Sequence, residues 1–494
     1  MNYLSTRGGT AVSSAQAILR GLSPNGGLYV PEHIPEMPAG WLDPAASFTY
    51  QQLAASVLGL YFPELGAAEL QDMCGQAYSG FPAEVTPFTQ LDDRTCLLEL
   101  YHGPTLAFKD IALQLLPRLI VRAAQLTGEK RTIHILTATS GDTGKAALEG
   151  FRDVDGTACT VFYPHGGVSD LQYRQMATSL GKNVQVVAVH GNFDDAQTGV
   201  KRLFSDPSFR ARLDAAGRLP SSANSINIGR LVPQIVYYIY GYRYLRQANL
   251  LNTDGLMDIC VPTGNFGDIL AAWYAKHMGL PVGRLICASN CNRVLTDFFT
   301  TGVYDIRRPF HKTISPSMDI LISSNLERLL FEVCGRDPET VKGWMASLKE
   351  EGRFSLPGEL LRKLQAEFDA GTADDGQTRT AIRDTFERSR VLVDPHTAVG
   401  LSVLEALRGG KTQKRATLVN ATASPYKFVS DVSAALGLPV TGKVFDDARA
   451  LSARTSTPVP ASIAALETME IRHTTVSEPD QMGEAVMAFI GKEA

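Results

Sequence analysis

Lys109 is the residue of this sequence with the clearest potential for covalent chemistry. It lies in HGPTLAFKD, residues 102–110, directly before the apolar run IALQLLPRLIVRAA. The run offers apolar side chains around nearly its whole circumference, which predicts a buried helix with Lys109 at its N-terminal end. Burial and the positive end of a helix both disfavour a charged amine, so we expect a nucleophilic amine with a lowered pKa, able to form a Schiff base. The alternative is an ordinary lysine that extends to the surface.

A loop of small residues, TSGDTG at 139–144, stands between a predicted strand and a predicted helix. Amides at the helix start and the hydroxyls of Thr139, Ser140 and Thr143 can donate hydrogen bonds to a carboxylate or phosphate. A capped turn is the alternative explanation for the same residue types. The loop is not a P-loop, because that motif requires Gly at 139 and Ser or Thr at 146, where this chain has Ala146.

A second glycine loop, PTGNFGD at 262–268, also leads from a strand to a helix. Gly264 and Gly267 permit a close approach, so the amides around Asn265 and Phe266 can converge on a phosphate at the helix N-terminus. The Asp268 carboxylate would repel that phosphate unless it points aside, where it can favour the helix dipole or hold the loop through a hydrogen bond. Neither glycine loop reads G-x-G-x-x-G, so a dinucleotide site is not favoured.

A threonine follows the last clear strand, in NATASPYKF. The neutral hydroxyl of Thr422 can hydrogen-bond a heteroaromatic ring nitrogen without forcing that nitrogen to become a cation. Alone, this residue would not attract notice.

The elements that must position these loops alternate between strand and helix from about residue 130. The alternation predicts parallel strands joined by crossover helices, and RLVPQIVYYIYGYRYLRQA predicts a long buried helix within the series. Residues 365–385, with DAGTADDGQT, are interpreted as a mobile polar surface segment. Asp394 is expected to cap a helix that begins at Pro395.

Composition limits the classes of ligand. The 494 residues include 47 Lys and Arg against 51 Asp and Glu, a net charge of -4, which does not favour a nucleic acid or an anionic membrane as partner. No apolar run reaches membrane-spanning length. Seven scattered cysteines favour a reducing cytoplasm, and Cys287 and Cys291 lack a second pair at metal-ligand spacing. Small molecules are therefore the expected ligands, without a metal.

Several long motifs occur here in one order: HGPTLAFKD, TSGDTG, PTGNFGDILA, SPSMDILISSNLERLL and DPHTAVG, with NYLSTRGG and GGLYVP before them. Together they resemble the threonine synthases of the longer type. The resemblance implies a pyridoxal 5'-phosphate enzyme of fold type II, the tryptophan synthase β-like group, with two parallel-sheet α/β domains and a small, mainly helical N-terminal domain. The implied division is 1–90 (N-terminal), 91–129 with 231–440 (larger, cofactor-binding), 130–230 (smaller) and 441–494 (C-terminal helical extension).

The implied activity is that of a carbon–oxygen lyase acting on a phosphate ester. It converts O-phospho-L-homoserine and water to L-threonine and phosphate, the last step of threonine biosynthesis, in the cytoplasm and as a monomer or homodimer. One alternative is a threonine synthase-like phospholyase that releases 2-oxobutyrate, phosphate and ammonia. A rival from another class is a nucleotide-binding or regulatory protein on the same sheet, in which Lys109 is only structural.

The resemblance also assigns roles to individual residues. Lys109 matches the catalytic Schiff-base lysine, and Arg230 is the candidate for the substrate phosphate, with structural packing on the aromatic helix as its alternative. Ser424 departs from the histidine usual in the family at this position. The remaining matches are, for the cofactor, Gly264, Asn265, Phe266, Gly267, Asp268 and Thr422, and, for the substrate carboxylate, Thr139, Ser140 and Thr143.

Overall fold

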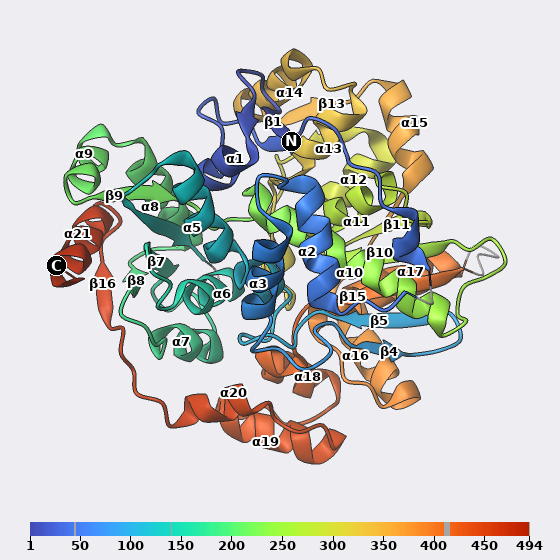
Figure 1. Ribbon diagram of the computed structural model, residues 1–494. Helices are drawn as coiled ribbons and strands as arrows, with labels where there is room; N and C mark the ends of the chain where they lie inside the picture. The colour runs from blue at the N-terminus through green and yellow to red at the C-terminus, as the bar shows by residue number, and fades with distance from the viewer. Residues whose placement is uncertain (44–45, 140, 410–414, 494) are drawn as a thin grey trace.

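The structure is a computed structural model that describes residues 1–43, 46–139, 141–409 and 415–493. Two mainly parallel sheets, each covered by helices, form its two halves, and the N-terminal helices lie against both (Figure 1). The predicted α/β class is confirmed. Neighbouring parallel strands need crossover connections, and helices supply them here.

The larger sheet has six strands and is parallel except for its last pair, β4 and β5. Helix α17 (Pro395–Arg408) packs on β10, β11 and β15, and Asp394 caps it as predicted, by accepting from the amides of His396 and Thr397. In spatial order the strands are β14 (Phe368–Thr372), β11 (Val282–Ser289), β10 (Met257–Pro262), β15 (Ala416–Ala421), β5 (Thr95–Glu99) and β4 (Phe88–Gln90).

The smaller sheet is parallel throughout. Its three inner strands are almost wholly buried, as expected for a sheet with helices on both faces, whereas the two edge strands are partly exposed. In spatial order they are β16 (Thr475–Ser477), β8 (Val184–Val189), β7 (Thr157–Pro164), β6 (Thr132–Ala138) and β9 (Arg218–Ser221).

Helices follow the strands in the order that the alternation predicts. The long aromatic helix is confirmed as α10 (Ile228–Gln247), which is buried along most of its length. Beside the smaller sheet lie α6 (Asp142–Phe151), α7 (Asp170–Ala177), α8 (Phe193–Ser205) and α9 (Pro207–Ala215). The larger half also contains α11 (Gly267–His277), α12 (Val294–Thr301), α13 (Leu326–Val333), α14 (Pro338–Glu351), α15 (Gly358–Glu367), α16 (Asp375–Ser389), α18 (Val429–Ala435) and the ribbon β12 (Val303–Asp305) with β13 (Arg353–Ser355).

Residues 365–385 are not the mobile surface segment that the sequence suggested. They contain β14, which pairs in parallel with β11, and the start of α16. A Cβ at Gly371 would lie 2.6 Å from Val403 Cγ1, so the glycine is there because helix α17 packs closely on the strand. The polar composition therefore reflects an edge strand followed by a capped helix.

The ends of the chain differ in detail from the predicted division. The N-terminal part has α1 (Ser14–Arg20), α2 (Tyr50–Tyr61) and α3 (Ala67–Ala77), but also an antiparallel sheet in the order β2 (Val12–Ser13), β1 (Asn2–Ser5), β3 (Tyr29–Pro31). The C-terminal part has α19 (Val444–Thr455), α20 (Ala461–Ala464) and α21 (Met482–Glu493), and it also adds β16 to the smaller sheet. Figure 1 shows this part running from the larger half along the lower edge to the smaller half.

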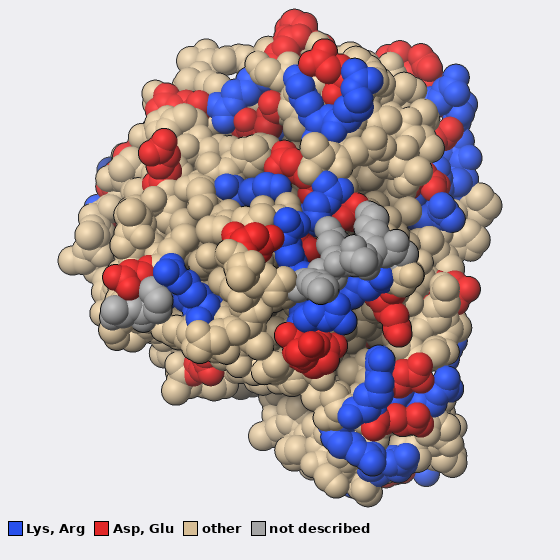
Figure 2. Space-filling model, turned by 90° about the vertical axis from the view of Figure 1, so that its right-hand side faces the viewer, with Lys and Arg blue, Asp and Glu red and all other residues tan. Residues whose placement is uncertain are grey.

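The surface carries no field of one sign on the face that Figure 2 shows. Lys and Arg side chains alternate there with Asp and Glu, in agreement with the small net charge. Among the described residues, no helix is long and apolar enough to cross a membrane.

Candidate active site

A cleft of about 2270 Å³ is lined by both halves of the molecule, at the carboxyl ends of strands from each sheet. Ala138 and Thr139 line it from the end of β6, Thr263 from the end of β10 and Thr422 from the end of β15. This is where open parallel sheets bind ligands. The cleft exceeds a usual small-molecule pocket of about 300–1,000 Å³ and has room for a cofactor and a substrate together.

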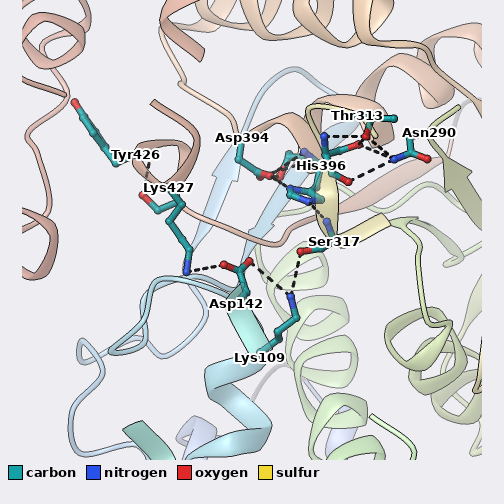
Figure 3. Close-up of polar contacts among 12 residues, drawn as sticks. Lys109, Asp142, Asn290, Thr313, Ser317, Asp394, His396, Tyr426 and Lys427 are labelled. Carbon is teal, nitrogen blue, oxygen red and sulfur yellow. Dashed lines mark hydrogen bonds and ion pairs between the residues drawn. The ribbon is translucent and has the colours of Figure 1, made fainter. Parts of the chain in front are cut away.

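Lys109 is the first residue of the short helix α4 (Lys109–Leu113), which confirms its predicted position. Its Nζ donates to Ser317 Oγ at 3.3 Å and lies 3.6 Å from Asp142 Oδ2 (Figure 3). Burial lowers the pKa of the amine, the nearby cations Lys427 and Arg230 lower it further, and Asp142 opposes the change. Because α4 has only five residues, its dipole contributes less than the sequence argument assumed.

Asp142 lies between two amines. Lys427 Nζ is 2.9 Å from its Oδ1, and both side chains are almost fully buried, with exposed fractions of 0% for Lys427 and 3% for Asp142. Burial alone would raise the pKa of Asp142, but the charges of Lys427 and Lys109 outweigh it and hold the pKa well below its usual range. Asp142 is therefore an ionised carboxylate at the first turn of α6.

The second glycine loop leads from β10 into α11, as predicted. Phe266 adopts a left-handed conformation, with φ 62°, and no side chain caps the first turn of α11. A Cβ at Gly264 would lie 2.6 Å from Ser317 O, so the segment around Ser317 lies directly against this loop. Ser323 Oγ also donates to Gly264 O at 2.7 Å, and Asn325 Nδ2 donates to Asn265 O at 2.9 Å.

The Asp268 carboxylate points aside, which was one of the two arrangements considered. It accepts hydrogen bonds from Tyr237 and Tyr238 of α10 and from Asn420 Nδ2, the last at 3.1 Å. Burial raises the pKa of Asp268, and these hydrogen bonds act in the opposite direction. Asp268 therefore joins the start of α11 to α10 and β15, and its place as a direct cofactor contact stays a prediction.

The predicted carboxylate loop is held by its own first hydroxyl. Thr139 Oγ1 accepts from the amides of Gly141 at 2.9 Å and Gly144 at 3.0 Å, and Thr139 is 2% exposed. Thr139 therefore shapes the loop, and its direct contact with a ligand stays a prediction. Thr143 lines the cleft and is half-buried. Ser140 lies outside the described residues.

Thr422 lines the cleft beside the lysine segment. Its carbonyl accepts from the amide of Phe108 at 2.8 Å, and the amide of Ser424 donates to Leu106 O at 3.0 Å. Two residues from distant parts of the chain, Thr422 and Lys109, are thereby held in a fixed relation. Ser424, at the position that departs from the family, accepts from the amide of Tyr426 at 3.3 Å and so caps the 3₁₀ helix η3 (Pro425–Phe428).

Arg230 is a buried cation at the cleft without an acidic partner among the described residues. It is 3% exposed, its Nη1 donates to Ala223 O at 2.9 Å, and its Nε has no partner. Burial lowers its pKa to about 10, which still leaves the guanidinium charged at neutral pH. A buried guanidinium with a spare donor fits an anionic ligand.

Several cleft residues received no role from sequence reasoning, although each lies in a quoted motif. They are Asp142, Ser317, His396 and Lys427. His396 Nδ1 lies 2.8 Å from Asp394 Oδ1, and its Nε2 accepts from the amide of Ser317 at 3.1 Å (Figure 3). The only signal in the sequence that could have identified these four residues was that each is a polar residue without an assigned role in an otherwise apolar or turn-forming motif.

The donor set fits pyridoxal phosphate. The group needs an amine for its aldehyde, amides for its phosphate and a partner for its ring nitrogen. Lys109 supplies the amine, the uncapped first turn of α11 supplies amides, and Thr422 supplies a hydroxyl. Ser317 contacts both Lys109 and Gly264, which brings the amine and the glycine loop to one place.

Comparisons with known proteins agree with this reading. The chain matches the families described as Threonine synthase N terminus over residues 2–78, Pyridoxal-phosphate dependent enzyme over 84–422, and Threonine synthase, C-terminal over 397–490. It is 39% identical to threonine synthase of Pseudomonas aeruginosa, over 88% of this chain and 90% of that one. It is also 39% identical to human threonine synthase-like 1, over 85% of this chain but 58% of that one.

Among solved structures, PLP-bound threonine synthase from Brucella melitensis matches with a TM-score of 0.88 and 37% identity, covering 100% of this chain and 99% of that one. The family match and the structural match therefore agree on both the cofactor and the fold. The chain belongs to the threonine synthase family of pyridoxal-phosphate-dependent enzymes.

Proposed function

We propose that the protein converts O-phospho-L-homoserine and water to L-threonine and phosphate in the cleft around Lys109. The observation that carries the proposal is the position of Ser317, which accepts from Lys109 Nζ at 3.3 Å and whose carbonyl lies against Gly264. A reactive amine and an anion-binding loop thus meet at one point of the cleft.

When bound, pyridoxal phosphate supplies an electron sink for charge that develops next to the amino group of the substrate. In our proposal the amides of residues 264–267 hold its phosphate and the Thr422 hydroxyl holds its ring nitrogen. Lys109 would hold its aldehyde, and with the substrate in place the neutral Lys109 amine would accept the proton from the substrate α-carbon. The lowered pKa of Lys109 supports this role.

The two anionic ends of the substrate require separate partners. We assign the substrate carboxylate to the loop 139–144, whose amides lie at the start of α6, together with the Thr143 hydroxyl. We assign the phosphate to Arg230, because its buried guanidinium has no carboxylate partner among the described residues and keeps a spare donor. Removal of a proton from the β-carbon then expels phosphate from the γ-carbon, and this loss is favoured when a cation stays beside the leaving group.

Water must add at the β-carbon after phosphate has left, so the site has to admit solvent in a controlled way. The open cleft supplies a route for this water. Failure to direct the addition would release 2-oxobutyrate, phosphate and ammonia, which is the product set of the phospholyase alternative.

The test is a product assay with matched lysine variants. Purified protein loaded with pyridoxal phosphate is incubated with O-phospho-L-homoserine, and threonine, 2-oxobutyrate and phosphate are measured together. We expect threonine and phosphate in equal amounts, no turnover for Lys109→Ala, and activity near that of the parent for Lys145→Met, because Lys145 pairs with Glu149 away from the cleft lining. Oxobutyrate as the main product would establish the phospholyase reaction instead, and turnover by Lys109→Ala would refute the role of that lysine.

We further propose a cytoplasmic protein that acts as a monomer or homodimer without nucleic-acid or membrane partners. All seven cysteines lie in described ranges and are free thiols, as is usual in a reducing compartment. Light scattering of the purified protein measures the oligomeric state directly.

A further inference from the structure

A second lysine, Lys427, is buried beside the predicted cofactor lysine. Its Nζ lies 2.9 Å from Asp142 Oδ1 and donates to Thr105 O at 2.7 Å. The other oxygen of Asp142 faces Lys109 Nζ at 3.6 Å. Figure 3 shows the two amines approaching the carboxylate from different sides. One carboxylate is therefore shared by two lysines.

The three side chains come from separate parts of the fold. Lys427 belongs to η3, which follows β15 of the larger sheet, whereas Asp142 begins α6 beside the smaller sheet. The Lys427–Asp142 ion pair thus connects the two halves of the molecule across the cleft. Its Thr105 contact also ties Lys427 to the segment that leads into Lys109.

We propose that Lys427 is a positioning residue of the reaction. It neutralises Asp142, so that this carboxylate neither holds Lys109 as an ammonium ion nor repels the substrate carboxylate from the loop 139–144. The inference rests on the proposed function, because it concerns the state of the amine that reacts and of the loop that receives the substrate.

The charges around Lys109 explain why one neighbour can decide its state. Asp142 faces it from α6, Lys427 from η3 and Arg230 from α10, and His396 of α17 also acts on Asp142. An amine reacts with an aldehyde, or accepts a proton, only in its neutral form. With Lys427 present, the negative charge of Asp142 is already balanced by a closer cation, at 2.9 Å against 3.6 Å.

Removing Lys427 would leave Lys109 as the nearest cation to an ionised, buried carboxylate. A nearby unbalanced carboxylate favours the charged form of an amine and raises its pKa by about 1 unit or more. The same carboxylate would lie at the loop assigned to the substrate carboxylate and would repel it. Both effects are absent if Lys427 serves only to hold Thr105.

Lys145 provides a matched control. It is also a buried lysine, with 9% exposure, and it stands one turn along α6 from Asp142. It pairs with Glu149 at 3.5 Å and donates to Ser179 at 3.3 Å, and it does not line the cleft. Replacing it removes the same type of side chain and one ion pair without changing the partners of Asp142.

The experiment measures the amine without turnover. Apoprotein is mixed with pyridoxal phosphate, and the rate at which the absorption band of the bound cofactor appears is recorded against pH. The midpoint of this profile reports the pKa of Lys109. We expect Lys427→Met to move it upward by about 1 pH unit or more, Asp142→Asn to move it downward, and the double variant to return toward the parent. Lys145→Met should leave it unchanged.

Steady-state kinetics adds an independent measurement, in which Lys427→Met should raise KM for O-phospho-L-homoserine more than the double variant does. A folded Lys427→Met protein with the parent midpoint and the parent KM would overturn the inference. If Lys427→Met does not fold, Asp142→Asn and the double variant provide the test, since neither leaves an unpaired buried carboxylate. Identical pH midpoints for these two variants would also overturn the inference. A Lys109→Ala protein that forms the same absorption band would instead refute the proposed function of Lys109.

Discussion

Gly264→Ala is expected to weaken the binding of pyridoxal phosphate indirectly, through a clash between the added methyl group and the backbone at Ser317. The added Cβ would lie 2.6 Å from Ser317 O and 3.4 Å from Met318 Cα, both backbone atoms. The backbone there cannot yield easily, because Asp319 Oδ1 accepts from Thr313 at 2.7 Å and Asn290 at 2.8 Å. The loop 264–267 must therefore move instead.

The cost follows from the usual effect of forcing a methyl group into a packed site, about 1–3 kcal/mol. If that strain is relieved in the apoprotein and has to be restored when the phosphate binds, the Kd for the cofactor rises by about 5- to 150-fold. The free energy of unfolding of the apoprotein should fall by less than this amount, since the loop relaxes when no ligand holds it.

The assay is a fluorescence titration of apoprotein with pyridoxal phosphate. Gly75→Ala in α3 is the control, because among the described residues no heavy atom outside the adjoining turns of that helix lies within 4 Å of its added Cβ. In a helix interior this change stabilises by about 0.5–1 kcal/mol and should leave the Kd unchanged. A Gly264→Ala protein that binds the cofactor as tightly as the parent, with Ser317 in its parent position in a crystal structure, would show that the loop does not hold the phosphate.

Three further predictions concern single side chains. Arg230→Met removes a charge-assisted hydrogen bond of about 1.5–3 kcal/mol, so kcat/KM for O-phospho-L-homoserine should fall about 10- to 100-fold while the Kd of the cofactor stays constant; an unchanged kcat/KM would return Arg230 to a structural role. Thr422→Asp offers the ring nitrogen a carboxylate in place of a neutral hydroxyl and should raise the ratio of 2-oxobutyrate to threonine, measured by chromatography; an unchanged ratio counts against the steering role of Thr422. Burial raises the pKa of Asp110 to about 6, despite hydrogen bonds from Thr105, so this group binds a proton in the folded state that it lacks in the unfolded state between about pH 4 and 6. Its stabilising contribution is complete below pH 4 and is lost as the pH rises through 6. Thermal melts should therefore show that the Tm of the parent falls relative to the Tm of Asp110→Asn as the pH rises from about 4 to 6.

Much of the framework follows from local pattern. The strands around TSGDTG and PTGNFGD are apolar runs bounded by turn residues, and both became parallel strands that end at the cleft, β6 and β10. Capping chemistry was equally local, since the Asp394 carboxylate reaches only the next two or three amides. Such features require no knowledge of distant contacts, which is why sequence reasoning finds them.

β14 shows where local pattern fails. Phe368 is its one buried residue, and the other positions are half-buried. An edge strand with a single partner needs little apolar surface, so its composition does not differ from that of a loop. Gly371 reads as a flexible position in the sequence, although the structure uses it for close packing against Val403.

The charges of the site were beyond local inference for another reason. Lys427 and Asp142 are far apart in the chain, and each lies in a motif that turn chemistry explains without a ligand. Only the packing of the two halves of the molecule brings Lys427 Nζ to 2.9 Å from Asp142 Oδ1. The low pKa expected for Lys109 was reasoned from burial and a helix dipole. In the structure burial is the main cause, and the cations Lys427 and Arg230 act where the dipole was expected to.

The balance of charge in the cleft connects the lysine chemistry to the choice of substrate. Lys109 and Lys427 flank the carboxylate of Asp142, and Arg230 acts on Lys109; once the Lys109 amine is neutral, Lys427, Arg230 and Asp142 together still carry one excess positive charge. A buried excess charge is costly until an anion compensates it. A substrate with a carboxylate at one end and a phosphate at the other supplies that compensation at both places. Homoserine, which has a neutral hydroxyl where the substrate has phosphate, would leave the buried Arg230 guanidinium unpaired, so the site should reject it far more strongly than the loss of a few contacts would suggest.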